Sequence, residues 1–471
     1  MAEVMAKGEF FWGAASSAFQ VEGHVAADGR GRSKWDVYTH DYRITEAVVG
    51  KQYDADLAIN AYDRAQSLAD VALMREAGLD AYRFSLSWSR ILPAGAGAVN
   101  QAGLDHYSRF VDDLLAAGIT PLATLYHWDF PEALHEKGGW HNRDVIGWFA
   151  DYAAAVYGAL ADRVATFITL NEPYIDLFMM DLIAEKARDR KPDPTRHASA
   201  DFGRQAPAMH NMFVAHARAV EAFRAAQRGD GMIGVALPLY PTIPVDPEKP
   251  EDVAAARLTD GLLNRWPLDA VFRGTYPDDV IAALRRHNPD FAPAAADTAV
   301  LKANPVDFLG VNFYSPAYVR RDDAYPMGLG WGSADTNPDE VQAFNGPVRP
   351  EALHQLLIRM RDEYGNPPVA ITENGTGFGD FDEVMAGDTV KDPLRTDYIL
   401  RHIEATLKAR REGADVRGYL VWSLFDNFEW IQGYERRFGM VHVDFATQKR
   451  TPKQSFRAYR DLIARQRAAG G

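Results

Sequence analysis

Short apolar segments recur along the chain, and each is followed by a turn and then by helix-like sequence. Eight of them read as buried strands: Phe10–Ala15, Ala81–Leu86, Ile119–Leu125, Thr166–Leu170, Met232–Leu237, Asp307–Tyr314, Pro367–Thr372 and Gly418–Leu424. Amphipathic stretches with helical spacing lie between them: Ser67–Ala77, Gly103–Ala117, Asp144–Leu160, Gln205–Ala226, Pro350–Tyr364 and Thr396–Glu412. Strand and helix alternating eight times predicts an α/β fold, a single (β/α)8 TIM barrel.

The residues beyond a minimal barrel are expected in long loops on the catalytic face. The candidates are Val25–Asp56, Ala184–Phe202, Pro241–Pro250 and Arg320–Arg349. In this kind of barrel, such loops build the wall of the pocket. The sequence contains no internal repeat, low-complexity tract or interdomain linker, so we expect one catalytic barrel domain over residues 1–471.

Composition narrows the possible partners. Hydrophobic residues make up 47% of the chain, and the formal net charge of −14 is spread without long runs of one sign. The sequence contains no cluster of basic residues that could bind phosphate groups, so no nucleic-acid partner is expected. The absence of cysteine excludes disulfides, thiolate metal sites and cysteine nucleophiles. No apolar run has the length of a membrane span and Met1–Phe11 has no signal-peptide pattern, so we expect a soluble, cytoplasmic protein without a membrane partner.

Two glutamates stand at the ends of predicted strands, about two hundred residues apart. Glu172 lies in an Asn-Glu-Pro sequence after Thr166–Leu170, and Glu373 begins a Glu-Asn-Gly sequence after Pro367–Thr372. In a parallel barrel, both carboxyl groups would meet at the C-terminal rim, where such barrels keep their chemistry. A facing pair of carboxyl groups is what glycoside hydrolysis requires. Either motif alone is weak evidence, because a glutamate at a strand end can be an ordinary polar residue.

Further motifs accompany the glutamates in a fixed order, at the ends of seven of the eight predicted strands. They include Phe19-Gln20-Val21-Glu22-Gly23, Tyr82-Arg83-Phe84-Ser85, Tyr126-His127-Trp128-Asp129, Asn312-Phe313-Tyr314, Trp422-Ser423-Leu424-Phe425-Asp426-Asn427-Phe428-Glu429-Trp430 and Arg437-Phe438-Gly439. With them, the chain resembles glycoside hydrolase family 1, the β-glucosidase family, over nearly its whole length. The resemblance implies a retaining β-glycosidase, most often a β-glucosidase, whose partner is a small β-glycoside or oligosaccharide.

The resemblance also assigns chemistry to five residues. Glu172 matches the general acid, which later acts as the base, and Glu373 matches the nucleophile. Arg83 matches an arginine that pairs with the nucleophile, and Tyr314 matches a tyrosine that donates to the same carboxylate. Asn171 matches an asparagine that holds the sugar 2-hydroxyl. Since the two glutamates need opposite protonation states, we expect a raised pKa for Glu172 and an ionised Glu373.

Sugar recognition is assigned by resemblance to a set of polar and aromatic side chains. They are Gln20, His127, Trp128, Asn171, Asn312, Trp422, Glu429, Trp430 and Phe438. Trp422 matches the aromatic platform under the sugar. No His-Glu-x-x-His motif or other compact ligand spacing occurs, so neither a metal nor another cofactor is implied.

Glu429 narrows the substrate class. Relatives that cleave 6-phosphoglycosides have a serine there, with a lysine and a tyrosine nearby to receive the phosphate. A carboxylate would repel a dianionic phosphate in a poorly solvated pocket and can instead accept hydrogen bonds from the 4- and 6-hydroxyls. The sequence therefore favours unphosphorylated sugars.

Several functions remain open at this point. The segment Tyr174–Met180 and the charged stretch Glu185–Thr195 depart from the family pattern on the leaving-group side, which leaves the aglycone preference undecided. A transglycosidase, a member that prefers β-galactosides or β-fucosides, and a non-catalytic sugar-binding protein are the alternatives. The last usually lacks one of the two glutamates, whereas this chain keeps both. The sequence does not indicate the oligomeric state.

Overall fold

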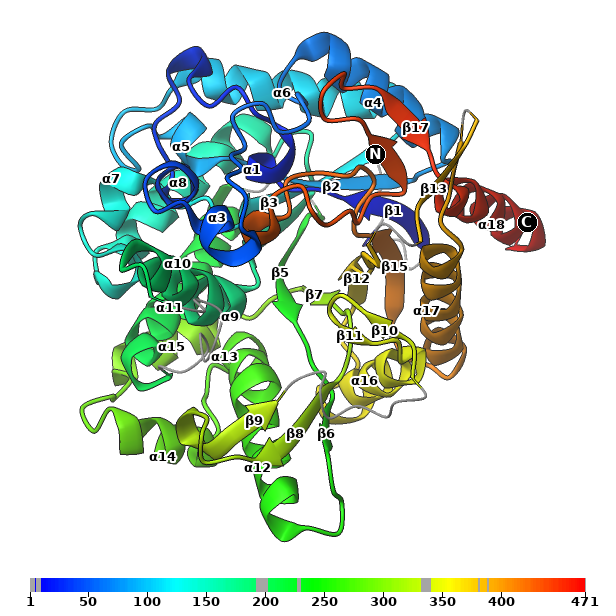
Figure 1. Cartoon of the computed structure of the whole chain (residues 1–471). Helices are drawn as coiled ribbons and strands as arrows, with labels where there is room; N and C mark the ends of the chain where they lie inside the picture. The colour runs from blue at the N-terminus through cyan, green and yellow to red at the C-terminus, as the bar shows by residue number, and fades with distance from the viewer. Residues whose placement is uncertain are drawn as a thin grey trace.

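Eight parallel strands close into a barrel at the centre of the molecule (Figure 1). The computed structural model of the chain describes residues 5, 10–191, 202–226, 230–331, 340–379, 382–387 and 389–470. The barrel strands are β1 (Phe11–Ala15), β2 (Ala81–Ser85), β3 (Thr120–Tyr126), β4 (Thr166–Asn171), β5 (Met232–Pro238), β7 (Phe308–Asn312), β12 (Val369–Glu373) and β15 (Val416–Val421). Each strand pairs with the barrel strand before it in the chain, and β1 closes against β15. The predicted (β/α)8 barrel is confirmed.

The barrel separates two apolar cores. The inner one takes a side chain from every barrel strand: Phe11, Ala81, Leu122, Ile168, Ala236, Phe308, Ala370 and Leu420. The outer and larger core fills the space between the strands and the surrounding helices. Successive residues of a strand point to opposite faces, so one short apolar run supplies both cores. This explains why the predicted strands are continuously apolar.

Within the described residues, seven helices of 13 or more residues surround the barrel (Figure 1). They are α4 (Arg64–Glu76), α6 (Gln101–Ala116), α8 (Val145–Leu160), α11 (Phe202–Ala226), α16 (Pro350–Glu363), α17 (Pro393–Arg411) and α18 (Gln454–Gly470). Three of them begin three residues earlier than the amphipathic pattern indicated. The Asp63 side chain accepts the Gln66 backbone N–H at 2.9 Å and starts α4. Pro393 occupies the first turn of α17, where its missing N–H costs nothing.

Two of the expected loops are described over their whole length, and both contain regular structure. Val25–Asp56 holds α2 (Lys34–His40) and α3 (Ile44–Val49). A capping box at Ser33, in which Ser33 and Asp36 bond reciprocally to backbone N–H groups, starts α2. Pro241–Pro250 holds strand β6 (Thr242–Pro244), which pairs with β8 (Ala317–Arg321) in a three-stranded sheet with β9 (Leu329–Trp331).

The other two expected loops lie partly outside the described residues. In Ala184–Phe202, helix α10 (Asp181–Arg188) continues from the preceding turn, and residues 192–201 lie outside the description. In Arg320–Arg349, residues 332–339 lie outside it. A short hairpin of β10 (Gln342–Ala343) and β11 (Gly346–Pro347) follows. Both segments were predicted as loops on the catalytic face.

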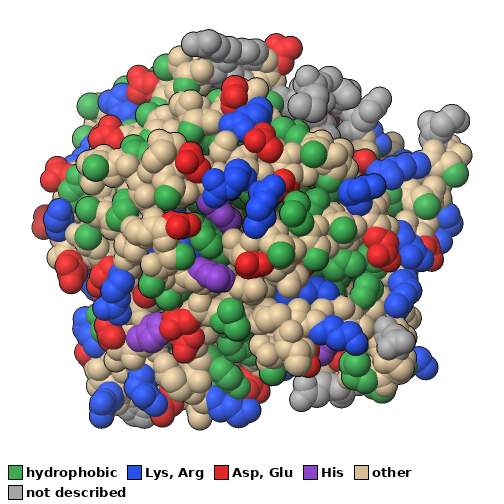
Figure 2. Space-filling model, turned by 90° about the horizontal axis from the view of Figure 1, so that it is seen from above, with side chains coloured by type: hydrophobic (Ala, Val, Ile, Leu, Met, Phe, Trp, Pro, Cys, Tyr) green, Lys and Arg blue, Asp and Glu red, His purple; other side chains and the backbone are tan. Residues whose placement is uncertain are grey.

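The remaining elements are short or lie at the periphery. They are α1 (Ala18–Val21), α5 (Trp88–Ile91), α7 (Glu132–His135), α9 (Pro173–Ile175), α12 (Pro250–Asp260), α13 (Trp266–Arg273), α14 (Asp278–His287), α15 (Ala295–Ala303), and the hairpins of β13 (Val384–Ala386) with β14 (Thr389–Lys391) and β16 (Val441–Val443) with β17 (Arg450–Pro452). None of the helices in the described ranges is both long and apolar enough to cross a bilayer. On the face shown in Figure 2, acidic and basic side chains are interspersed without a large area of one sign.

Candidate active site

Irregularities in two barrel strands aim the two glutamates. The pairing of β4 with β5 shifts register between Ile168 and Asn171, and the pairing of β12 with β7 shifts between Ile371 and Glu373. A bulge bends a strand and re-aims the side chain beside it. Glu172 follows at once in the left-handed region, at φ +46°, with its N–H donating to the Ala236 carbonyl at 2.9 Å. The backbone therefore departs from regular strand geometry next to both glutamates.

Glu373 is held on both carboxylate oxygens. Arg83 Nη1 donates to one at 2.7 Å, and the Tyr314 hydroxyl donates to the other at 2.7 Å. Arg83 is fully buried and uses its two other nitrogens on Asn171 Oδ1, at 2.6 Å, and Thr124 Oγ1, at 3.0 Å. Charge-assisted hydrogen bonds of this kind favour the ionised carboxylate.

Glu172 has a weaker set of partners. Among the described residues, its carboxyl group accepts one side-chain hydrogen bond, from Asn312 Nδ2 at 2.8 Å. The same amide donates to Asn171 Oδ1 at 3.0 Å, and its oxygen accepts from the Thr372 hydroxyl at 2.7 Å. Asn312 is therefore committed to holding Asn171 and Glu172 together.

Burial raises the pKa of both glutamates, and it raises that of Glu172 further. For Glu172, the charge of Glu373 adds to burial, and the Asn312 amide only partly opposes it. For Glu373, Arg83 and Tyr314 oppose burial. The first proton to leave the pair therefore comes from Glu373. The Arg83 guanidinium favours the ionised form of Glu373, but this carboxyl is only 3% exposed, so burial outweighs the ion pair and the net pKa shift is upward.

His127 connects Asn171 to the aromatic rings of Trp422 and Trp430. Burial lowers the pKa of His127 well below its ordinary value, and the Arg83 charge adds to this effect, so the ring is neutral. Its Nε2 lies 3.1 Å from Asn171 Nδ2 and accepts that hydrogen bond, which assigns the remaining proton to Nδ1. Nδ1 has no hydrogen-bond partner within the described part of the chain and is available to a ligand hydroxyl.

Trp128 lies beside His127 but makes a different contact. Its indole N–H donates to the Asn171 carbonyl at 3.0 Å, and its ring packs against Trp430 with centroids 4.7 Å apart. Its indole N–H is therefore committed to the protein backbone. The sugar contact that the resemblance assigns to Trp128 stays a prediction.

Gln20 and Glu429 form a second polar group. Gln20 Nε2 donates to Asn427 Oδ1 at 3.1 Å, to the Phe428 carbonyl at 2.8 Å and, more distantly, to Glu429 at 3.4 Å. Ser17 donates to the Gln20 amide oxygen at 2.7 Å and fixes its orientation. Burial raises the pKa of Glu429 to about 8, and the charge of Glu373 adds to this.

Aromatic rings line the same region. The His127 ring stacks on Trp422 at 5.5 Å and on Trp430 at 6.0 Å between centroids. Phe438 meets Tyr314 edge-on at 6.2 Å. Gly375 makes room for the Trp422 backbone, because a Cβ there would lie 1.6 Å from the Trp422 carbonyl oxygen. The Glu-Asn-Gly motif therefore serves the packing of Trp422 as well as the placement of Glu373.

Sequence reasoning missed several residues of this network. They are Ser17, Thr124, Thr372 and Asn427, which bond to predicted site residues, and Phe344, whose ring meets Phe438 at 6.1 Å. Thr124 and Thr372 are polar residues inside otherwise apolar strands. That departure from the pattern was the available signal.

A pocket of about 330 Å³ opens beyond the two glutamates. Its lining is mostly apolar and includes Tyr174, Met179, Tyr240, Leu263, Pro316 and Phe344. Burial raises the pKa of Tyr240, and the charges of Glu172 and Glu373 add to the effect, so this wall lies close to both. The pocket has the size of a small-molecule site.

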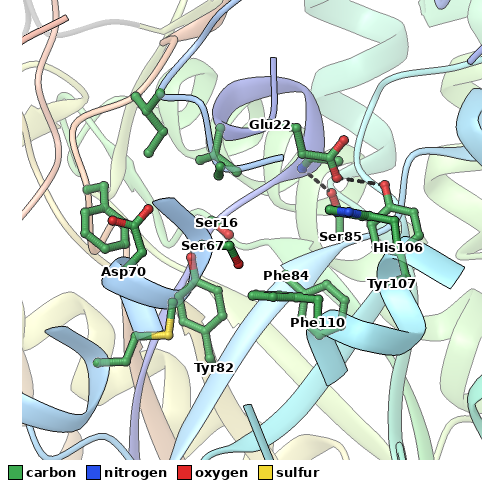
Figure 3. Close-up of a pocket in the computed structure, with 16 residues that line it drawn as sticks. Ser16, Glu22, Ser67, Asp70, Tyr82, Phe84, Ser85, His106, Tyr107 and Phe110 are labelled. Carbon is green, nitrogen blue, oxygen red and sulfur yellow. Dashed lines mark hydrogen bonds between the residues drawn. The ribbon is translucent and has the colours of Figure 1, made fainter. Parts of the chain in front are cut away.

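A second cavity lies between β2 and helices α4 and α6 (Figure 3). Its volume is about 40 Å³. A water needs about 10–15 Å³ of such space, so this cavity could hold a few waters and is too small for a sugar ring. Glu22 on its wall accepts hydrogen bonds from Tyr107 and Arg90, each at 2.7 Å. These contacts join the C-terminal end of α1 to helices α5 and α6.

Two groups of side chains within the described residues have spacings that a cation could use. One consists of Glu383, Asp426 and His442. Its carboxylates already accept from Lys453 Nζ, at 2.6 and 2.8 Å, so their charge is matched by a buried cation. The other, His40 with Asp54 and Asp56, lies at the surface. Neither includes Glu172 or Glu373.

Known proteins are similar to this chain over nearly its whole length. Residues 3–468 match the model of glycosyl hydrolase family 1. The chain is 41% identical over 463 residues to beta-glucosidase A of Enterobacter agglomerans, covering 96% of this chain and 94% of the relative. The GH1 beta-glucosidase from Exiguobacterium antarcticum B7 has a TM-score of 0.87 and 34% identity, with 98% and 99% of the two chains covered. The beta-glucosidase from Thermotoga maritima in complex with glucoimidazole has a TM-score of 0.85 and 37% identity, with 97% and 98% covered. The chain belongs to glycosyl hydrolase family 1 and is a glycoside hydrolase.

Proposed function

We propose that this chain is a retaining β-glucosidase that hydrolyses the non-reducing terminal β-D-glucosyl residue of short, unphosphorylated glucosides. The observation that carries the proposal is the unequal environment of the two glutamates. Glu373 has Arg83 on one oxygen and Tyr314 on the other, whereas Glu172 accepts one amide among the described residues. Glu373 is suited to be the anionic nucleophile, and Glu172 is suited to hold a proton.

In the first step, Glu373 attacks the anomeric carbon while Glu172 gives its proton to the glycosidic oxygen. The bond to the leaving group breaks, and an ester forms between the sugar and Glu373. In the second step, Glu172 takes a proton from water as the water attacks the same carbon, and the ester breaks. The sugar leaves with its original configuration, and both carboxyl groups return to their starting states.

The change of role at Glu172 has an electrostatic basis. In the free enzyme, the charge of Glu373 adds to burial and keeps Glu172 protonated. Once Glu373 is an ester, that charge is gone and the pKa of Glu172 falls. The same residue then serves as a base for the second step.

The groups around the sugar support a polyhydroxylated ligand. His127 Nδ1, Gln20 and Glu429 supply donors and acceptors beside the stacked rings of Trp422 and Trp430. Asn171 lies between Arg83 and His127 and is placed for the 2-hydroxyl.

The repulsion expected between Glu429 and a phosphate depends on whether Glu429 carries a charge. Because the pKa of Glu429 rises to about 8, this group is largely neutral in the empty pocket at pH 7. A phosphate bound there would still lie near the Glu373 charge. Within the described residues, the groups that act on Glu429 are Glu373 and the neutral Gln20 amide, and no cation is among them. Unphosphorylated sugars therefore remain the proposed substrates.

Glucose is proposed over galactose because relatives along the full chain are named beta-glucosidases, one of them in complex with glucoimidazole. On the leaving-group side, the apolar pocket with Tyr174, Met179 and Phe344 favours an aryl or other apolar aglycone. Such a group would bury its surface there without leaving charged side chains unpaired.

A panel of nitrophenyl β-glycosides tests the proposal. We expect the highest kcat/KM on the glucoside and negligible rates on the 6-phosphoglucoside and on α-glucosides. Proton NMR should show the β-anomer of glucose as the first product, before mutarotation. The α-anomer as first product would overturn the retaining mechanism, and a preference for the galactoside or fucoside would overturn the sugar assignment. Added acceptor sugars, with product analysis, separate hydrolysis from transglycosylation.

A further inference from the structure

A buried ion-pair cluster lies beneath the turn that carries Glu172. Lys34, on α2, is 1% exposed, and its Nζ donates to Asp176 Oδ1 at 2.6 Å and to Asp181 Oδ1 at 2.7 Å. Asp176 is fully buried. A buried lysine and carboxylate are costly to desolvate and persist only where their geometry is well satisfied.

The second oxygen of Asp176 is tied to the barrel itself. It accepts the Tyr126 hydroxyl at 2.6 Å, and Tyr126 is the last residue of β3. The Trp140 indole N–H lies 3.3 Å from the same hydroxyl oxygen and donates to it. Asp176 therefore joins the C-terminal end of β3 to the loop helix α2.

Asp176 is also linked through the backbone to Glu172. Its N–H donates to the Glu172 carbonyl at 3.2 Å and closes the first turn of α9. Asp176 also begins a π-helical turn, Asp176–Met180, a feature that often occurs at functional sites. Glu172 is left-handed at φ +46° and has one side-chain hydrogen bond in the described part of the chain. The direction of its side chain thus depends strongly on the turn that follows it.

We propose that Asp176, held by Lys34 and Tyr126, is a positioning residue that keeps the Glu172 carboxyl aligned with the glycosidic oxygen. The proposal rests on the acid role proposed for Glu172. Asp176 touches neither the substrate nor the reacting atoms, and it acts through the backbone turn. Asp181 shares the same lysine but lies nine positions beyond Glu172. It supplies a matched control with the same type of partner.

The test compares Asp176→Asn with Asp181→Asn on aryl β-glycosides of the sugar that the wild type prefers. A misaligned acid should slow substrates with poor leaving groups most, because good leaving groups depart without protonation. For Asp176→Asn we expect kcat/KM to fall about ten-fold more on the phenyl glycoside than on the 2,4-dinitrophenyl glycoside. For Asp181→Asn, the kcat/KM relative to wild type should be the same on the phenyl and the 2,4-dinitrophenyl glycoside within about two-fold.

Tyr126→Phe covers the case in which Asp176→Asn does not fold. It removes one tie to Asp176 and keeps the Lys34 ion pair, and we expect the same selective loss at about three-fold. Equal losses on both substrates in Asp176→Asn, or in Tyr126→Phe if the former is unfolded, would overturn the proposal. So would an equal selective loss in Asp181→Asn.

Glu172→Ala, measured in parallel, separates this inference from the function on which it rests. If Glu172→Ala shows no leaving-group selectivity, the acid role of Glu172 is wrong. If Glu172→Ala is selective and the Asp176 and Tyr126 variants are not, only the positioning role is wrong.

Discussion

Arg83 and Glu373 are 290 positions apart in the chain, and their Nη1 and Oε1 atoms lie 2.7 Å apart in the mouth of the barrel. Their strands, β2 and β12, are not neighbours, since β1 and β15 lie between them. The ion pair therefore spans the rim of the barrel. Closure of the barrel creates the environment of the proposed nucleophile, and no local segment could supply it.

The shape of the arginine matters as much as its charge. In wild type, three guanidinium nitrogens meet Glu373, Asn171 and Thr124. We expect Arg83→Lys to lower kcat/KM by about 10²- to 10³-fold, because an ammonium group cannot reproduce that planar fork. Steady-state kinetics with circular dichroism checks this. Arg64→Lys, at the exposed pair with Asp113, is the control and should leave kcat/KM unchanged.

Removing the proposed acid should divide substrates by leaving group. In Glu172→Ala, glycosides with poor leaving groups should lose most of their kcat/KM, by about 10²-fold or more, whereas dinitrophenyl glycosides still form the intermediate. Added azide should then speed the second step and give a β-glycosyl azide, because a small anion needs no base. Product analysis by mass spectrometry and NMR checks this.

Glu221→Ala is the control for that experiment, because Glu221 is an exposed glutamate paired with Arg218. It should behave as wild type on every substrate. Equal losses on all leaving groups in Glu172→Ala, without azide products, would remove Glu172 from the acid and base role.

Glu429→Ser should weaken glucoside turnover. The wild-type side chain is placed to form hydrogen bonds with two hydroxyls. Hydrogen bonds of a largely neutral group are worth about 0.5–1.5 kcal/mol each, so a loss of about five- to 150-fold is expected. Relative activity on 6-phosphoglucosides should rise by less, because no lysine or tyrosine is added. Glu429→Gln, which keeps the shape and one acceptor, should lose less than the serine variant. A wild type that prefers the phosphorylated substrate would refute this interpretation of the pocket.

Asp129 should make stability depend on pH. Burial raises the pKa of Asp129 to about 8, against the opposing effect of the Ser87 hydroxyl. In the unfolded chain the ordinary value is about 3.9. The folded state therefore binds the proton more tightly. The stability that this provides is complete below pH of about 4 and is lost as pH rises through about 8.

Asp129→Asn removes that titration. Between pH 5 and pH 9, the Tm of wild type should fall by at least about 2 °C more than that of the variant, since each unit of pKa shift corresponds to about 1.4 kcal/mol. Thermal unfolding at several pH values in one ionic strength measures the difference. Parallel curves for the two proteins would show that Asp129 is charged in the folded state throughout this range.

Much of the fold was predictable because each barrel strand contributes side chains to both apolar cores. It therefore appears in the sequence as a short, continuous apolar run. Helix starts were less predictable, since Asp63 and Pro393 determine them from outside the amphipathic pattern. Helices α2 and α3 were missed because they lie on a loop where capping and packing against neighbours, rather than periodicity, stabilise them.

The candidate site was predictable where motifs mark strand ends, as at Glu172 and Glu373. The roles of the residues that hold the site in place were not predictable. Thr124 and Thr372 lie within strands and become partners of Arg83 and Asn312 only when the barrel closes. The Lys34–Asp176 contact joins positions 142 residues apart and has no motif in either segment. The bond from Trp128 to the Asn171 carbonyl likewise depends on the left-handed turn at Trp128, which no local pattern indicated.

The central claim is that Glu373 forms the covalent intermediate, and its most direct test is identification of the labelled residue. A 2-deoxy-2-fluoroglucoside with a good leaving group should inactivate the wild type and add one fluoroglucosyl unit, and peptide mass spectrometry should place it on Glu373. Glu373→Gln should remain folded, take up no label and lose nearly all turnover, because an amide cannot form the ester. A label on any other residue of the active wild-type enzyme would contradict the account.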